Sequence, residues 1–90
     1  MDPELLIKIK EKLPTWTVND NKLYNIIKTK NWTESMSIAN MISFLAEKQN
    51  HHPDLIVKYG SVTIELFTHT TNNITEKDIL LAQKINEVLS

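Results

Sequence analysis

Two short runs of alternating apolar residues flank Gly60, the only glycine in the chain. Apolar or aromatic side chains occupy every second position in residues 55–59, and the alternation continues through residues 62–66. Successive side chains of a strand point to opposite faces, so each run predicts a strand with one apolar face. A glycine between two such runs predicts a turn. The sequence therefore predicts a β-hairpin whose apolar face must be buried by other elements.

The N-terminal third predicts a helix followed by another hairpin. Residues 2–13 begin with Asp-Pro-Glu, a helix-start pattern, and then carry leucine and isoleucine at helical spacing. Pro14 ends this helix, because proline can neither donate a backbone hydrogen bond nor continue the coil. Residues 15–18 and 23–29 are rich in β-branched and apolar side chains, and the Asn-Asp-Asn between them is a turn sequence.

Two further helices complete the predicted order. Thr33 opens a helix with one apolar stripe, which runs to about Asn50, before Pro53. Residues 75–78 resemble a capping box, and apolar residues at helical spacing follow it. We therefore expect a single α+β domain over residues 1–90, in the order α-ββ-α-ββ-α. Its four-stranded antiparallel sheet should have three helices packed on one face.

The composition excludes several classes of protein. Ten basic and eleven acidic side chains give a net charge of −1, without the positive charge that is typical of nucleic-acid-binding proteins. The absence of cysteine excludes disulfides, thiolate metal sites and cysteine nucleophiles. No apolar run approaches the roughly 20 residues of a membrane span, and the N-terminus lacks a signal-peptide core. We expect a cytoplasmic protein with neither a nucleic acid nor a membrane as partner.

All three histidines lie at the ends of the hairpin around Gly60. His51 and His52 precede its first strand, and His69 follows its second strand. If Gly60 and Ser61 are the turn residues, the ladder continues to set His52 opposite His69, about 5 Å away. A register shifted by two residues would still leave the imidazoles within about 10 Å of one another.

Three interpretations of this cluster are open. The first is that the histidines are unrelated surface residues. The second is a zinc site of three imidazoles. The third is acid–base chemistry, in which one imidazole donates a proton and another accepts one. Adjacent residues such as His51 and His52 tend to point apart and no familiar ligand spacing is present, which disfavours a metal. Imidazole titrates near neutral pH, so one ring can donate a proton while another accepts one. We favour metal-free acid–base chemistry.

The histidines belong to a longer spaced series. Its members, in chain order, are Glu47, His51, His52, Pro53, Tyr59, His69 and Asp78. This series resembles the signature of the pterin-4a-carbinolamine dehydratases, and the predicted order of elements resembles that family's single-domain fold. The resemblance covers essentially the whole chain.

The resemblance implies a lyase that dehydrates 4a-hydroxytetrahydropterin to quinonoid dihydropterin and water without a cofactor, in support of tetrahydrobiopterin recycling. His51 and His69 are expected to form the acid–base pair, and His52 to orient and polarise the pterin. Glu47, one helical turn before His51, is expected to hold an imidazole tautomer. Asp78 either contacts the site or only closes the cap of the last helix.

Four further residues are expected to bind the pterin: Asn50, Pro53, Thr68 and Thr70. The chain also departs from the family's usual residues at several positions. Asn50 stands where an acidic residue is common, and Leu55 and Ile56 stand where aromatic residues are common. Phe67 replaces a smaller residue just before Thr68.

Two other functions stay open. The first is a non-enzymatic dimerisation or coactivator-type binding protein of the same fold. The second is a pterin-handling role outside aromatic amino-acid hydroxylation. The resemblance also implies a homo-oligomer, a dimer or tetramer, and a place in the pathway of an aromatic amino-acid hydroxylase.

Overall fold

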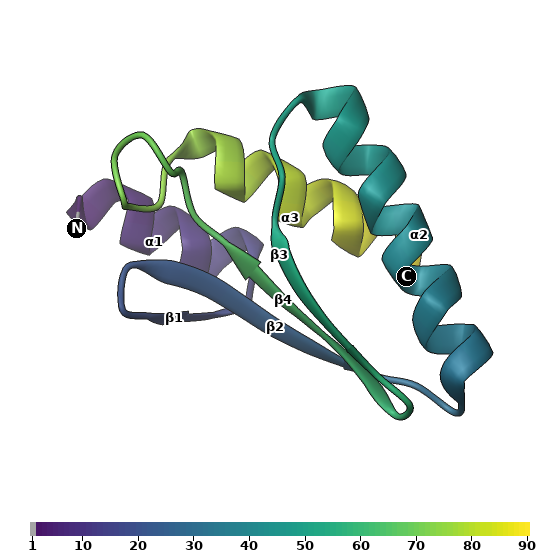
Figure 1. The fold of residues 1–90 in the computed structure, drawn as a ribbon. Coiled ribbons are helices and arrows are strands. Elements are labelled where there is room, and N and C mark those ends of the chain that lie inside the picture. The colour runs from purple at the N-terminus through teal and green to yellow at the C-terminus, as the bar shows by residue number, and fades with distance from the viewer. Residues whose placement is uncertain (1) are drawn as a thin grey trace.

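The computed structural model describes residues 2–90, which form three helices and four strands (Figure 1). The helices are α1 (Pro3–Lys12), α2 (Trp32–Gln49) and α3 (Glu76–Leu89). The strands are β1 (Thr17–Asn19), β2 (Lys22–Lys28), β3 (Asp54–Lys58) and β4 (Ser61–Leu66). All strand pairs are antiparallel, and the sheet order is β1-β2-β4-β3. The predicted order α-ββ-α-ββ-α and the antiparallel sheet are confirmed.

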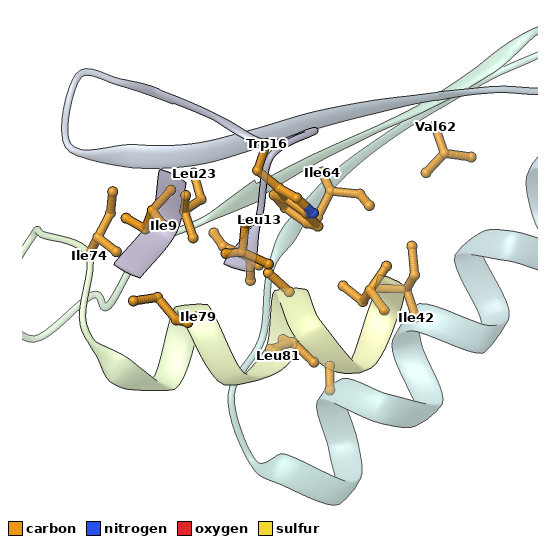
Figure 2. Close-up of a cluster of buried hydrophobic side chains, with 14 residues drawn as sticks. Ile9, Leu13, Trp16, Leu23, Ile42, Val62, Ile64, Ile74, Ile79 and Leu81 are labelled. Atoms are coloured by element: carbon orange, nitrogen blue, oxygen red, sulfur yellow. The ribbon is translucent and has the colours of Figure 1, made fainter. Parts of the chain in front are cut away.

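The core lies between the sheet and the helices, which cover one side of it (Figure 1). Val62, Ile64 and Leu66 alternate along β4, and all three are fully buried. Figure 2 shows Val62 and Ile64 in the same cluster as Ile42 of α2 and Leu81 of α3. Burying one side chain of this size contributes about 1.5–3 kcal/mol relative to leaving it exposed. The predicted apolar face of the second hairpin is therefore the centre of the fold.

Side-chain caps begin the helices. Asp2 caps α1 as predicted, because its Oδ1 accepts a hydrogen bond from the Glu4 amide at 3.0 Å. Helix α2 begins one residue earlier than the predicted start at Thr33, because Asn31 is its cap. The Asn31 Oδ1 accepts a hydrogen bond from the Glu34 amide at 2.9 Å. No helix among residues 2–90 is both long and apolar enough to cross a membrane.

The end of α2 sets the position of the paired histidines. Asn50 adopts the left-handed conformation, with φ 52° and ψ 42°, which asparagine tolerates better than most residues. The His51 amide then donates to the Ala46 carbonyl at 3.1 Å, which closes the last turn of the helix. The chain therefore leaves α2 abruptly, with His51 and His52 between the helix and β3.

The predicted turn of the second hairpin is wrong in its position. Lys58 pairs with Ser61, so the two turn residues are Tyr59 and Gly60 rather than Gly60 and Ser61. The strand pairing is therefore shifted by two residues from the predicted register. Tyr59 is 67% exposed and does not pack in the core.

Contacts from outside the hairpin hold this turn. The Thr29 amide donates to the Gly60 carbonyl at 3.0 Å. The carbonyl of Tyr59 lies 3.2 Å from the hydroxyl of Ser35 and 3.3 Å from that of Thr29. These two hydroxyls are 2.6 Å apart, so one of them donates to the carbonyl and the other donates to that hydroxyl. These donors come from the end of β2 and the first turns of α2, so the local turn sequence contains no sign of them.

Removing one of these donors should destabilise the protein. Ser35 is fully buried, so Ser35→Ala leaves the Tyr59 carbonyl with a weaker set of partners. We expect the free energy of unfolding to fall by about 1–3 kcal/mol, measured by urea denaturation. Ser37→Ala is the matched control, because Ser37 is exposed and bonds only to a carbonyl of its own helix. Equal losses in the two variants would contradict this account of the turn.

Candidate active site

The end of α2 and the loop between β4 and α3 border a shallow depression of about 240 Å³. Its lining residues are Asn50, His51, His52, Thr68, His69, Thr70 and Lys77. The structure thus brings all three histidines to one place, although the hairpin register differs from the predicted one. Directly opposed positions are not needed for this, because the segments beyond the strand ends supply the side chains.

Another depression is larger but lacks suitable chemistry. It encloses about 450 Å³ on the face of the sheet away from the helices. Its lining residues are Thr15, Thr17, Asn19, Tyr24, Asn25, Ile26 and Thr63. None of these is a histidine or a carboxylate, whereas the smaller depression is lined by all three histidines, which makes it the candidate active site.

His51 is the buried member of the cluster. Its Nε2 lies 2.5 Å from Oδ1 of Asp78, and the residue is only 8% exposed. An ionised carboxylate can only accept hydrogen bonds, so the hydrogen of this pair is assigned to Nε2. The other ring nitrogen, Nδ1, forms no hydrogen bond with any residue among 2–90. No buried side-chain nitrogen or oxygen in these residues lacks a hydrogen-bond partner, so the unbonded Nδ1 is accessible to solvent. Nδ1 is therefore available to accept a proton.

Asp78 holds His51 and closes the helix cap at the same time. Its carboxylate is fully buried, and its Oδ2 accepts hydrogen bonds from the Thr75 amide at 2.8 Å and the Thr68 hydroxyl at 2.9 Å. Thr75 and Asp78 together form the capping box of α3. Asp78 therefore contacts His51 through Oδ1 and closes the helix cap through Oδ2, and its part in the chemistry of the site stays a prediction.

A chain of hydroxyls supports this carboxylate. Thr68 gives its single hydroxyl hydrogen to Asp78, so the 2.6 Å contact between the Thr68 and Thr75 hydroxyls requires Thr75 to donate. The Thr68 hydroxyl is thus engaged on the protein side, although the residue also lines the depression. Its predicted contact with substrate stays a prediction, and its contact with Asp78 is the one seen.

His52 is paired with a different carboxylate, and in a different environment. Its Nε2 contacts Oε2 of Glu47, and the two side chains are 54% and 75% exposed. The imidazole that Glu47 contacts is that of His52 and not that of His51, and its expected role in holding a tautomer stays a prediction. Because both groups are solvated, this pair is held far less firmly than the pair of His51 and Asp78.

His69 is the exposed histidine of the β4–α3 loop. No hydrogen bond to its ring is formed by any residue from 2 to 90. Its imidazole instead contacts the phenyl ring of Phe67, with ring centroids 4.3 Å apart and planes inclined by 39°. The sequence identified Phe67 only as a departure from the family's usual residue.

Two of the three remaining residues predicted to bind the pterin line the depression, and one does not. Asn50 and Thr70 line the depression, whereas Pro53 is partly buried beside it and is not among the lining residues. Lys77 also lines the depression and was missed in the sequence. A signal was present: a lysine in the first turn of a helix faces an unfavourable dipole, so this position gains nothing for helix stability from a positive charge.

The site offers proton donors and acceptors. Within residues 2–90, no group of three or more histidine, aspartate or glutamate side chains is arranged to hold a metal ion. That the protein works without a metal stays a prediction, which rests on the types and spacing of the histidines. One buried imidazole with a free nitrogen and two solvated imidazoles beside it suit general acid–base chemistry.

The comparisons agree on one family. A family model described as "Pterin 4 alpha carbinolamine dehydratase" matches residues 2–88. A Prochlorococcus marinus (strain MIT 9313) protein named for this dehydratase is 40% identical over 83 residues, which cover 92% of this chain and 86% of that protein. A similarly named Sulfolobus acidocaldarius protein is 44% identical over 73 residues, covering 81% and 80%.

Solved structures share the fold. The Brucella melitensis transcriptional coactivator/pterin dehydratase superimposes with a TM-score of 0.90 at 26% identity, and the match covers 100% of this chain and 98% of that one. A pterin dehydratase-like protein described as a RuBisCO assembly factor of the α-carboxysome gives a TM-score of 0.64 at 15% identity, covering 80% and 83%. The second likeness shows the fold alone. With the matched sequence, the spaced histidines and the fold in agreement, the chain belongs to the pterin-4a-carbinolamine dehydratase family.

Proposed function

We propose that this protein dehydrates 4a-hydroxytetrahydropterin to quinonoid dihydropterin and water by histidine acid–base catalysis. One observation carries the proposal. His51, His52 and His69 line a single depression, and the buried carboxylate of Asp78 holds His51 with one ring nitrogen free. The names of the related proteins support the same activity.

The reaction needs one proton delivered and one removed. The bond between C4a and the hydroxyl oxygen breaks, and that oxygen leaves as water once it has received a proton. A ring nitrogen loses its proton as the new carbon–nitrogen double bond forms. The two transfers balance, so the enzyme ends in the protonation state in which it began, after its groups exchange a proton with water.

The geometry supports distinct roles for the histidines. His51 and His69 form the proposed acid–base pair, and the free Nδ1 of His51 is the better defined of the two proton positions. His52 orients and polarises the pterin, with Glu47 as its partner. Each positioned proton transfer typically accelerates a reaction by about 10²–10⁴-fold. Asn50 and Thr70, which line the depression, are the proposed contacts for the polar edge of the pterin.

The wider setting follows from the substrate. A 4a-hydroxytetrahydropterin is the product of an oxygenation that uses tetrahydropterin, so an aromatic amino-acid hydroxylase is the proposed source, with tetrahydrobiopterin recycling as the outcome. Assembly into a dimer or tetramer and a cytoplasmic location stay predictions.

The direct test is the rate of dehydration with purified protein. We expect wild type to accelerate the loss of a 4a-hydroxytetrahydropterin, followed by its ultraviolet absorbance, and His69→Ala to reduce the rate by about 10²-fold. His69 is exposed, so its loss should leave thermal unfolding unchanged. Thr63→Ala, on the outer face of the sheet, is the control. A folded wild type with no acceleration would overturn the proposal.

The same experiment addresses the non-enzymatic alternative. The Brucella melitensis neighbour is described as both a transcriptional coactivator and a pterin dehydratase. In this chain, Trp32 and Phe44 of α2 are 50% and 66% exposed, and they are side chains that a protein partner could cover. If the wild type lacks dehydratase activity and a variant without all three histidines keeps its partner binding, the binding role replaces the enzymatic one.

A further inference from the structure

The phenyl ring of Phe67 lies against the imidazole of His69. The two residues lie just beyond the end of β4 and are separated by Thr68. Their ring centroids are 4.3 Å apart, at an interplanar angle of 39°. Offset or tilted aromatic pairs at this separation attract each other beyond the contribution of their buried area.

Within residues 2–90, His69 differs from the other two histidines because no hydrogen bond holds its ring. His51 and His52 each hydrogen-bond to a carboxylate. For His69, the contact seen within residues 2–90 is the aromatic one with Phe67. An exposed imidazole without such support would sample several rotamers, and only some of them would place it over the depression.

Phe67 is itself held from two directions. In the observed register Leu23 pairs with Leu66, so the next position sets Lys22 opposite Phe67. The Lys22 ammonium lies 4.8 Å from the centroid of the Phe67 ring, in a cation–π contact, and 3.5 Å from Oε1 of Glu65. One residue further along, the Thr68 amide donates to the Asn73 carbonyl at 2.8 Å, which anchors the backbone between the two rings.

From these contacts we propose that Phe67 is a positioning residue for His69. Its ring supports the imidazole and restricts it to the rotamer that faces the depression. The role rests on the proposed function for its effect on rate, but the ring contact can be tested without any activity. Phe67 does not line the depression and need not touch substrate.

Two substitutions separate the ring from the bulk of the side chain. Phe67→Leu keeps an apolar side chain and removes the aromatic support, whereas Phe67→Tyr keeps the ring. Phe44→Leu is the matched control. Phe44 is an exposed phenylalanine of α2 that lies outside the depression. The ammonium of Lys48 lies 5.7 Å from the centroid of its ring, so it too has a lysine beside it.

The first readout is the nuclear magnetic resonance spectrum of the histidine ring protons. In wild type, the ring current of Phe67 should shift the carbon-bound protons of His69 away from the values of a free histidine. We expect Phe67→Leu to remove that shift, and Phe67→Tyr and Phe44→Leu to keep it. An unchanged His69 spectrum in Phe67→Leu would overturn the proposal, whatever the enzymatic activity of wild type.

The second readout is steady-state kinetics. Loss of one supporting aromatic contact should lower kcat by about 2- to 10-fold, with a smaller change in KM, and Phe67→Tyr should recover most of the loss. In a His69→Ala background, Phe67→Leu should have no further effect, because its partner is gone. A loss of the same size in both backgrounds would show a general effect on the fold and would overturn the positioning role. An inactive wild type would instead contradict the proposed function.

Discussion

Asp78→Asn is expected to slow the dehydration by about 10²–10⁴-fold while the protein stays folded. The carboxylate uses Oδ2 to accept from Thr75 and Thr68 and Oδ1 to accept from His51. Asparagine has one acceptor oxygen and one donor NH₂ group. If its oxygen keeps the helix cap, its NH₂ group faces Nε2 of His51, which must then give up its hydrogen.

That change would reverse the tautomer of His51. The ring hydrogen would move to Nδ1, so the nitrogen that is not bonded to Asp78 would become a donor when it is needed as an acceptor. In the other orientation of the amide, NH₂ would meet the donors of Thr75 and Thr68, and the cap would weaken. Either way a charge-assisted hydrogen bond is lost, and we expect the free energy of unfolding to fall by about 1.5–3 kcal/mol.

Kinetics, urea denaturation and nitrogen-15 spectra of the histidines would test this together. Glu76→Gln is the control, because Glu76 is the adjacent acid in the same helical turn, is exposed, and pairs with Lys8 instead of a histidine. It should retain the wild-type rate. A folded Asp78→Asn protein with near wild-type kcat would show that Asp78 serves the helix alone.

The elements of this fold were predictable because their signals are local. Alternation along β4 predicts which side chains are buried, and Val62, Ile64 and Leu66 are fully buried. The Asp-Asn turn of the first hairpin is also local: Asp20 and Asn21 both adopt positive φ, at 52° and 60°, as a two-residue hairpin turn of this composition prefers.

The register of the second hairpin was not predictable, because distant residues decide it. Both Tyr59-Gly60 and Gly60-Ser61 are reasonable turns from their sequence. The donors of Thr29 and Ser35 select the first one by binding the carbonyls of Tyr59 and Gly60. Thr29 is 30 residues from Tyr59 along the chain, so no window around the turn contains this information.

Partners within the site were predictable only as far as spacing allows. The spaced series contains both Glu47 and Asp78, but spacing does not say which imidazole each carboxylate serves. Helical spacing favours a contact of Glu47 with His51. The left-handed Asn50 breaks that geometry, and Glu47 contacts His52 instead. The contact of Phe67 with His69 needs the direction of both side chains, which residue types alone do not supply.

The unequal surroundings of the two adjacent histidines lead to a second large expected effect. His51→Gln should lower kcat by about 10²–10⁴-fold. Glutamine can still donate an amide hydrogen to Asp78, so the buried carboxylate keeps a partner, but its side chain cannot exchange protons near neutral pH. The variant therefore removes the chemistry of His51 while it preserves much of the local structure. Circular dichroism and urea denaturation should show a folded protein.

His52→Gln is the matched comparison, because it makes the same replacement one residue further along. His52 and Glu47 are both solvated, so this variant should change KM more than kcat, by about 10-fold for loss of a hydrogen bond that orients substrate. The ranking of the two variants decides the roles. If His52→Gln loses far more kcat than His51→Gln, the solvated imidazole carries the proton and the burial of His51 against Asp78 serves the fold. If His51→Gln loses more, the carboxylate that caps α3 also prepares the base, and the start of that helix and the active site are built from the same three hydrogen bonds to Asp78.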